Sequence, residues 1–260
     1  MEIRKYNRRA WDNEVDKGNE WTLPVNTETI NEARLGNWHI KLTPTIPVPR
    51  EWFPNLKGLE VLCLASGGGQ QGPILAAAGA KVTVFDNSPM QLERDNYVAK
   101  RDSLDIYTFE GDMADLSFFN ESSFDLIVHP VSNNFTPNVL LVWKEAFRVL
   151  RKGAALLSGF VNPAIWLFDY DLAERSCILQ VKYKLPYSDE ADLDEKELKR
   201  RIENLEPLEF SHTLEQQIGG QTKAGFVITD MYEDRQSPDK NEPIAIYMAT
   251  CVATRAIKPI

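Results

Sequence analysis

The sequence predicts an α/β fold in which helices flank a seven-stranded, mostly parallel sheet whose last two strands pair antiparallel. Three observations support this prediction. Between residues 60 and 161, apolar runs alternate with stretches of helical periodicity, which implies parallel strands joined by right-handed crossovers. A glycine-dense loop at 66–72 follows the first apolar run. Two strand-like runs near the end of the chain leave no room for a crossover helix between them, which favours an antiparallel pair.

The glycine loop and its flanks form the most informative stretch. Residues 61–64 are predicted as a buried strand, 73–78 as a helix, and 82–85 as a second strand that ends at Asp86. Glycines let the backbone approach a ligand closely, and a helix N-terminus offers unpaired N–H groups. A carboxylate at the end of the second strand can accept hydrogen bonds from ribose hydroxyls. We interpret the stretch as part of a nucleotide-binding βαβ unit. The alternative is a loop that needs glycine only for a tight turn.

The composition of the chain argues against several classes of protein. The chain has 260 residues, 43% of them hydrophobic, and a net charge of −9, which argues against a broad nucleic-acid footprint. Its three cysteines are scattered and indicate no disulfide framework, and no metal-binding cluster is visible. The N-terminus is too polar for a signal peptide, and no apolar run is long enough to span a bilayer. We expect a soluble, cytoplasmic protein that acts on a small molecule; the oligomeric state stays open.

Residues 1–56 are predicted as an N-terminal helical lid or extension. A helix is expected over 3–17, with apolar side chains along one side and a basic start, and a second over 27–35, capped by Asn26. Trp11 and Trp38 are candidates for the wall of a ligand pocket, although aromatic core packing fits them equally well. The alternative for the first helix is a solvated surface element.

Residues 57–260 are predicted as the main domain. After Asp86, a helix is expected from Pro89 to about residue 101, with Ser88 as its N-cap. Further strands are expected at 106–109, 124–128 and 154–161, with an apolar helix at 139–150.

Residues 162–210 break this alternation and are predicted as an insertion beside the active face after the fifth strand. The segment has too few apolar residues for a core of its own. It contains an aromatic group (Trp166, Phe168, Tyr170), a strand-like run at 178–185, and a charged run at 189–201. That charged run is most simply a solvated helix or loop.

The last part of the chain is predicted as a helix followed by two strands. Thr213 and Gln216 resemble a capping box, so a helix is expected over 214–224, ending at Gly225. Strands are expected at 226–232 and 244–252, joined through 237–241.

This layout resembles the class I S-adenosylmethionine-dependent methyltransferases, which have a Rossmann-like fold. The first motif of that family is V-L-D-x-G-x-G-x-G, and residues 61–69 here are VLCLASGGG. Gly67 and Gly69 match it, whereas Ala65 replaces the first glycine and Cys63 replaces the acid. Asp86 matches the family acid that holds the ribose.

The later motifs of the family follow in order. Ser88 and Met90 match the pattern after the ribose acid, and residues 111–113 resemble the third-strand motif, whose Asp meets the adenine amino group. Residues 124–129 resemble the fourth-strand motif, whose end lies near the transferred methyl group. The resemblance implies S-adenosylmethionine as cofactor, held by Ala65, Ser66, Gly67, Gly69, Asp86, Asn87, Ser88, Met90, Gly111, Asp112, Met113 and His129.

Catalysis demands little of such a protein. The sulfonium is already a good leaving group, so the chain must mainly hold a nucleophile in line and exclude water. A base is needed only if the acceptor arrives protonated. His129 is the candidate base; packing is its alternative role. Asn133 and Asn134 follow it as candidates for orienting a polar acceptor, or as turn residues.

Two other functions fit parts of the pattern. Gly67-x-Gly69-x-x-Gly72 is formally a dinucleotide-binding motif, which would indicate an NAD(P)-dependent oxidoreductase. Its first glycine comes late after the strand, however, and the chain has no Tyr-x-x-x-Lys pair. A non-catalytic ligand-binding protein on the same fold is the third possibility. We predict methyl transfer to a small-molecule acceptor.

Overall fold

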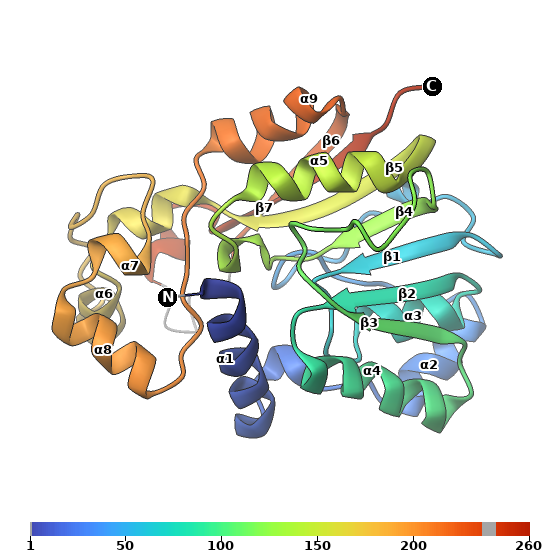
Figure 1. The fold of residues 1–260 in the computed structure, drawn as a ribbon, viewed down its shortest axis with the longest axis horizontal. Coiled ribbons are helices and arrows are strands. Elements are labelled where there is room, and N and C mark those ends of the chain that lie inside the picture. The colour runs from blue at the N-terminus through green and yellow to red at the C-terminus, as the bar shows by residue number, and fades with distance from the viewer. Residues whose placement is uncertain (1, 236–242) are drawn as a thin grey trace.

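A seven-stranded sheet runs through the computed structural model, which describes residues 2–235 and 243–260. Its strand order is β3-β2-β1-β4-β5-β7-β6 (Figure 1). The strands are β1 (Glu60–Leu64), β2 (Lys81–Asp86), β3 (Ile106–Glu110), β4 (Phe124–His129), β5 (Leu150–Val161), β6 (Val227–Asp234) and β7 (Cys251–Ile257). Strands β1 to β5 pair in parallel, whereas β7 is antiparallel to both β5 and β6. The predicted sheet is confirmed.

The strand order reverses between β1 and β4. From β1 the chain moves outward through β2 and β3, then returns to place β4 on the other side of β1. The loops that leave the two central strands therefore diverge, and they open a crevice at the carboxyl ends of the strands. In open α/β sheets this is the usual place for a ligand.

Helices cover both faces of the sheet. They are α1 (Ile3–Lys17), α2 (Thr27–Arg34), α3 (Gln71–Ala77), α4 (Pro89–Asp102), α5 (Val139–Val149), α6 (Tyr170–Ser176), α7 (Asp189–Asp192), α8 (Glu195–Glu203) and α9 (Gly220–Ala224). Helices α5 and α9 lie on one face of the sheet, and α2, α3 and α4 lie on the other (Figure 1). Helices α6, α7 and α8 belong to the insertion 162–210, and α1 lies between the insertion and the sheet (Figure 1). The predicted caps are made: the side chains of Asn26 and Ser88 accept from the backbone N–H of Thr29 and Gln91.

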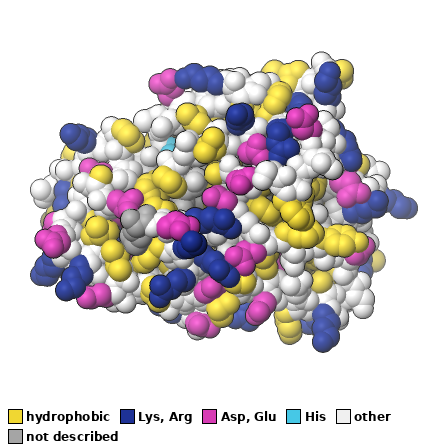
Figure 2. All heavy atoms as spheres, viewed as in Figure 1, with side chains coloured by type: hydrophobic (Ala, Val, Ile, Leu, Met, Phe, Trp, Pro, Cys, Tyr) yellow, Lys and Arg dark blue, Asp and Glu magenta, His cyan; other side chains and the backbone are white. Residues whose placement is uncertain are grey.

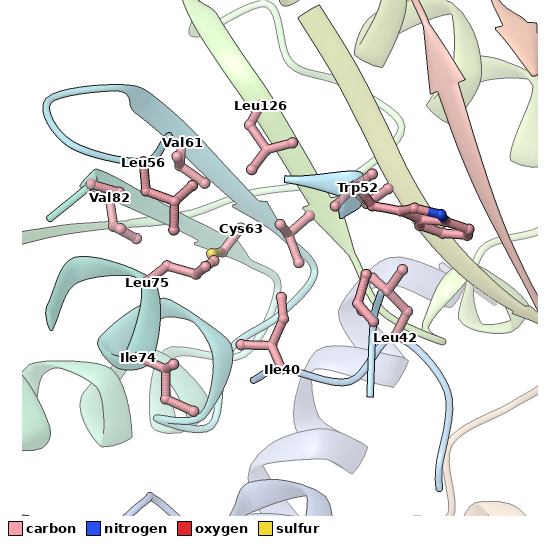
Figure 3. Packing of buried hydrophobic residues seen from close by; sticks show 14 of the residues in the cluster. Ile40, Leu42, Trp52, Leu56, Val61, Cys63, Ile74, Leu75, Val82 and Leu126 are labelled. Atoms are coloured by element: carbon pink, nitrogen blue, oxygen red, sulfur yellow. The ribbon is translucent and has the colours of Figure 1, made fainter. Parts of the chain in front are cut away.

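The core has one layer on each side of the sheet. Val61 and Cys63 of β1 pack with residues of α2 and α3, and Leu62 and Leu64 pack with α5. A strand buried on both faces reads as a continuous apolar run, which is why 61–64 was recognisable. Cys63 lies among the apolar side chains of the first layer (Figure 3), and burial raises the pKa of its thiol. Cys63 is therefore a reduced core residue.

Of the predicted strands, one is absent from the described part of the chain and one begins later than predicted. Residues 178–185 form no strand among the described residues; Val181 makes a single bridge with Phe168, because no second strand lies alongside to pair with. The strand expected at 244–252 begins only at Cys251, since that is where pairing with β5 and β6 starts. A 3-10 helix, Pro243–Ile246, precedes it. The predicted connection at 237–241 lies outside the described residues.

The helix predicted over 214–224 is present in a modified form. Thr213 and Gln216 exchange both hydrogen bonds of the capping box. The first turns, Glu215–Gly219, are π-helical and continue into α9. A Cβ on Gly220 would lie 2.7 Å from the Trp143 ring, so this glycine permits close packing of the helix on α5.

Candidate active site

A large cavity of about 1440 Å³ opens at the carboxyl edge of the sheet. Its wall is built from the loops after β1, β2, β3 and β4, from one side of α1, and from the insertion 162–210. Ala65, Ser66, Gly67, Asp86 and Asn87 line it. The cavity therefore lies at the point where the strand order reverses.

Asp86 places a carboxylate on this wall. Its Oδ2 accepts from the Gly67 N–H and its Oδ1 from the Ser88 N–H, both at 2.9 Å. Burial raises the pKa of Asp86, and the backbone N–H groups of Ser88 and Gly67 oppose that shift. A carboxylate has about four acceptor sites, so two backbone bonds leave capacity for the hydroxyls of a ligand.

A second acidic side chain, on the side of the glycine loop away from the cavity, holds that loop in place. Asp95 of α4 is fully buried, and its Oδ2 accepts from the N–H groups of Gly68 at 3.0 Å and Gly69 at 3.1 Å. Gly69 does not line the cavity, and a Cβ there would lie 2.9 Å from the backbone of Arg94. These N–H groups point into the protein. Glycine is needed at 68 and 69 because both residues pack closely on other segments: the segment before α2 (Trp21 and Pro24) and helix α4 (Arg94).

Helix α1 closes one side of the cavity. Asp12 accepts from the Ser88 hydroxyl at 2.6 Å and from the Met90 N–H at 3.3 Å. Asn87 donates to the backbone carbonyl of Arg4 at 2.9 Å. Ser88 and Met90 therefore hold the helix and do not line the cavity. Trp11 does line it, with its ring edge-on to Phe135 at 5.0 Å. Figure 1 shows α1 between the sheet and the insertion.

The end of β3 supplies two further wall residues. Asp112 and Met113 line the cavity, and the Asp112 Oδ1 accepts from the Ala114 N–H at 2.9 Å. Gly111 lies against the Phe85 ring, where a Cβ would come within 1.9 Å. Any larger residue at 111 would displace Phe85, which also lines the cavity.

The structure places His129 in the core. Its side chain is fully buried, its Nδ1 lies 2.9 Å from the Leu64 carbonyl oxygen, and its ring packs edge-on to Trp143 at 6.0 Å. Burial lowers its pKa to about 4. His129 does not line the cavity. This position fits packing, the alternative role of His129, better than the expected role as a base.

Of the four residues predicted to contact the acceptor or form the lid, Trp11 and Asn134 line the cavity. Trp38 packs away from it, with Phe53 edge-on at 5.0 Å and the Arg50 guanidinium 3.4 Å from its ring centre. Asn133 is fully buried and exchanges two side-chain hydrogen bonds with Gln217. Trp38 and Asn133 are therefore structural in this conformation.

The insertion contributes wall residues that the sequence analysis missed. Asp189, in the charged run predicted to be solvated, is 1% exposed and accepts from the Tyr187 hydroxyl at 2.7 Å. Arg201 pairs with it at 3.2 Å. Glu209 lines the cavity beside Asn134. Only the aromatic group around Trp166 was noticeable in the sequence, because isolated charges in a polar segment carry no periodic signal.

The described part of the chain has neither a metal-binding cluster nor a helix that could span a membrane. The residues 2–235 and 243–260 contain no group of three or more His, Cys, Asp and Glu side chains placed to hold a metal ion. Within the same ranges, every helix is too short or too polar to cross a membrane.

Comparison with known proteins agrees with the fold. Residues 62–158 match a family model described as a methyltransferase domain. A Bacillus subtilis (strain 168) protein described as the uncharacterized methyltransferase YbaJ is 54% identical over 253 residues, 97% of each chain. Among solved structures, an S-adenosylmethionine-dependent methyltransferase from Mesorhizobium loti has a TM-score of 0.60 at 16% identity, covering 80% of this chain and 94% of that one. One from Methanosarcina mazei has a TM-score of 0.57 at 17% identity, covering 81% and 96%.

The sheet order and the crevice define a class I S-adenosylmethionine-dependent methyltransferase. The chain belongs to the methyltransferase family that includes the B. subtilis relative. S-adenosylmethionine is accordingly its cofactor, and the cavity fits that molecule: Asp86 offers acceptor capacity for hydroxyls, while Phe85 and Met113 offer apolar surface.

Proposed function

We propose that this chain transfers a methyl group from S-adenosylmethionine to a small-molecule acceptor, and that both molecules occupy the cavity at the sheet edge. The extent of that cavity supports the proposal. The volume of about 1440 Å³ is lined by residues as far apart as Asp86 after β2 and Glu209 in the insertion. A pocket for one small ligand is roughly 300–1,000 Å³, so this volume accommodates two molecules.

The cofactor would lie against the loops after β1, β2 and β3. The cavity-lining members of the predicted set are Ala65, Ser66, Gly67, Asp86, Asn87, Asp112 and Met113. Asp86 would accept hydrogen bonds from ribose hydroxyls, and Asp112 from an adenine amino group. Four of the other five members, Gly69, Ser88, Met90 and Gly111, would position this wall through Asp95, Asp12 and Phe85. The fifth, His129, packs in the core.

The cofactor supplies a methyl group on a sulfonium that is already a good leaving group. The chain's own task is to bind two molecules, orient the acceptor and exclude water. We further propose that residues 1–56 act as a lid on the methyltransferase domain, 57–260.

The contacts of α1 over one side of the cavity support a small acceptor. Asn7 of α1 donates to the backbone carbonyls of Phe135 at 3.0 Å and Leu208 at 2.9 Å, so it ties the lid to the loop after β4 and to the insertion. Tyr6 donates to the carbonyl of Glu206 at 2.9 Å. A nucleic acid would need an open basic surface. On the face seen in Figure 2, Lys and Arg side chains near the middle are interspersed with Asp and Glu.

Calorimetric titration with S-adenosylhomocysteine, with NADH in parallel, tests the proposal. We expect roughly micromolar affinity for the first and no binding of the second. Asp86→Ala should weaken S-adenosylhomocysteine by about 10- to 100-fold, since it removes a charged hydrogen-bond acceptor. Asp105→Ala changes an exposed carboxylate just before β3 that does not line the cavity, and it should leave affinity unchanged. Binding of NADH alone, or equal affinity for Asp86→Ala and wild type, would contradict the proposal.

A further inference from the structure

An unpaired carboxylate lies on the wall that the insertion contributes. Glu209 lines the cavity, and within the described ranges no Lys or Arg forms an ion pair with it. Its Oε1 accepts from the Asn134 side-chain amide at 3.1 Å, and the Trp166 side chain is a second hydrogen-bonding partner. Arg201, which interacts electrostatically with Glu209, forms its ion pair with Asp189 at 3.2 Å. The charge of Glu209 is thus left for a ligand.

Beside it lies an orphaned acceptor atom. Asn134 lines the cavity and is 4% exposed, and its Oδ1 has no hydrogen-bond partner in the described structure. Buried carbonyl oxygens are almost always hydrogen-bonded, so an exception calls for an explanation. An amide oxygen and a carboxylate side by side both accept hydrogen bonds. They suit a ligand that carries several N–H donors.

The charge on the rest of the wall has the same sign. Thirteen Asp and Glu side chains line the cavity, against six Lys and Arg. The cations of the insertion are paired: Lys182 with Asp169 at 2.9 Å, Arg200 with Glu197 and Glu206. A cavity lined mainly by one sign of charge concentrates ligands of the opposite sign. Aromatic walls such as Trp11, Trp166 and Tyr187 favour cations over anions as well.

We propose that the methyl acceptor is an amine that binds as its ammonium form against Glu209 and Asn134, and that Glu209 is the base that removes its proton. This inference rests on the proposed function. An ammonium nitrogen has no free electron pair, so a proton must leave before the nitrogen can attack. That proton passes to the Glu209 carboxylate. The nitrogen then bonds to the methyl carbon, and the electron pair of the carbon–sulfur bond leaves with the sulfur. The methylated ammonium departs, and Glu209 releases its proton to water.

The raised pKa of Glu209 agrees with its role as a base. Burial and the charge of Asp189 raise its pKa to about 7, while Arg201, Trp166 and Asn134 oppose the rise. The other titratable groups facing it are Asp189 of α7 and Arg201 of α8. A base that titrates near neutral pH is efficient at accepting and releasing a proton.

Three probes of one shape and different charge test the proposal: benzylamine, benzyl alcohol and benzoate. Each is titrated calorimetrically into protein saturated with S-adenosylhomocysteine. We expect benzylamine to bind at least tenfold more tightly than benzyl alcohol, and benzoate not to bind. The affinity for benzylamine should rise with pH between 6 and 8, because Glu209 ionises in this range. The variant Glu209→Gln should lose both the tenfold preference for benzylamine and this pH dependence.

Glu203→Gln is the matched control. Glu203 is an exposed residue of α8 that does not line the cavity, so this variant should bind benzylamine like wild type. Glu209→Gln should still bind S-adenosylhomocysteine normally, which shows that it is folded. If S-adenosylhomocysteine binds but benzylamine does not, if benzoate binds as well as benzylamine, or if Glu209→Gln keeps the preference, the amine assignment is overturned. Failure of S-adenosylhomocysteine to bind wild type would instead overturn the proposed function.

Discussion

The Asp12 carboxylate of α1 accepts the Ser88 hydroxyl hydrogen bond at 2.6 Å, while the same Ser88 oxygen caps α4 by accepting from the Gln91 N–H. The N-terminal helix is thereby joined to the helix cap that follows Asp86 in the chain. A negative charge at a helix N-terminus is also favourable for the helix dipole. Helix α1 and the start of α4 are therefore one hydrogen-bonded unit.

Removing this link should loosen the lid. Asp12→Ala should lower the free energy of unfolding by about 1–2 kcal/mol, because it deletes two hydrogen bonds at a helix start, and weaken S-adenosylhomocysteine severalfold. Denaturant titration and calorimetry measure the two effects. Asp16→Ala, at an exposed site on the same helix, serves as control and should change neither. An unaltered Asp12→Ala protein would show that the lid is held elsewhere.

Asp95 should make the protein less stable as pH rises. Burial raises its pKa from 3.8 to about 8, so the folded state holds a proton that the unfolded state has lost. Stability is therefore lost as pH climbs from about 4 to 8. Asp95→Asn removes this titration while keeping an oxygen for Gly68 and Gly69. Its free energy of unfolding relative to wild type should rise by more than about 1 kcal/mol between pH 5 and pH 8. A constant difference across that range in urea melts would refute the assignment.

His129 should matter for stability and not for binding. His129→Ala should cost about 2–4 kcal/mol of unfolding free energy, because it empties part of a packed core next to Trp143. Affinity for S-adenosylhomocysteine, measured under conditions where the variant is folded, should stay within threefold of wild type. A large loss of affinity with little loss of stability would return His129 to the binding site.

The sequence predicted what local physical chemistry controls. The buried strand at 61–64, the glycine loop and the strand ending at Asp86 were recognisable because each depends on short-range properties: continuous burial, backbone freedom and a strand end. Helix starts at Asn26 and Ser88 followed from caps within three residues. Even α1 has the predicted bounds, since its amphipathic pattern lies within one segment.

Long-range contacts decided the rest. The final strand starts at Cys251 because only there do β5 and β6 lie alongside, which no local pattern records. The interpretation of the glycines changed for the same reason. The sequence suggested that they let the backbone approach a ligand, but the N–H groups of Gly68 and Gly69 donate to Asp95, more than twenty residues away.

The sequence by itself determined the class of protein, because the glycine loop, the strand that ends at Asp86 and the family motifs are all encoded in short segments. Only the tertiary structure decided which residues line the cavity. It buried His129 and turned Trp38 away, and it brought Glu209 to Asn134 across 75 positions of the chain. The physical reason is that a side chain's charge and burial depend on its neighbours in space, and the insertion meets the sheet edge only when the chain is folded.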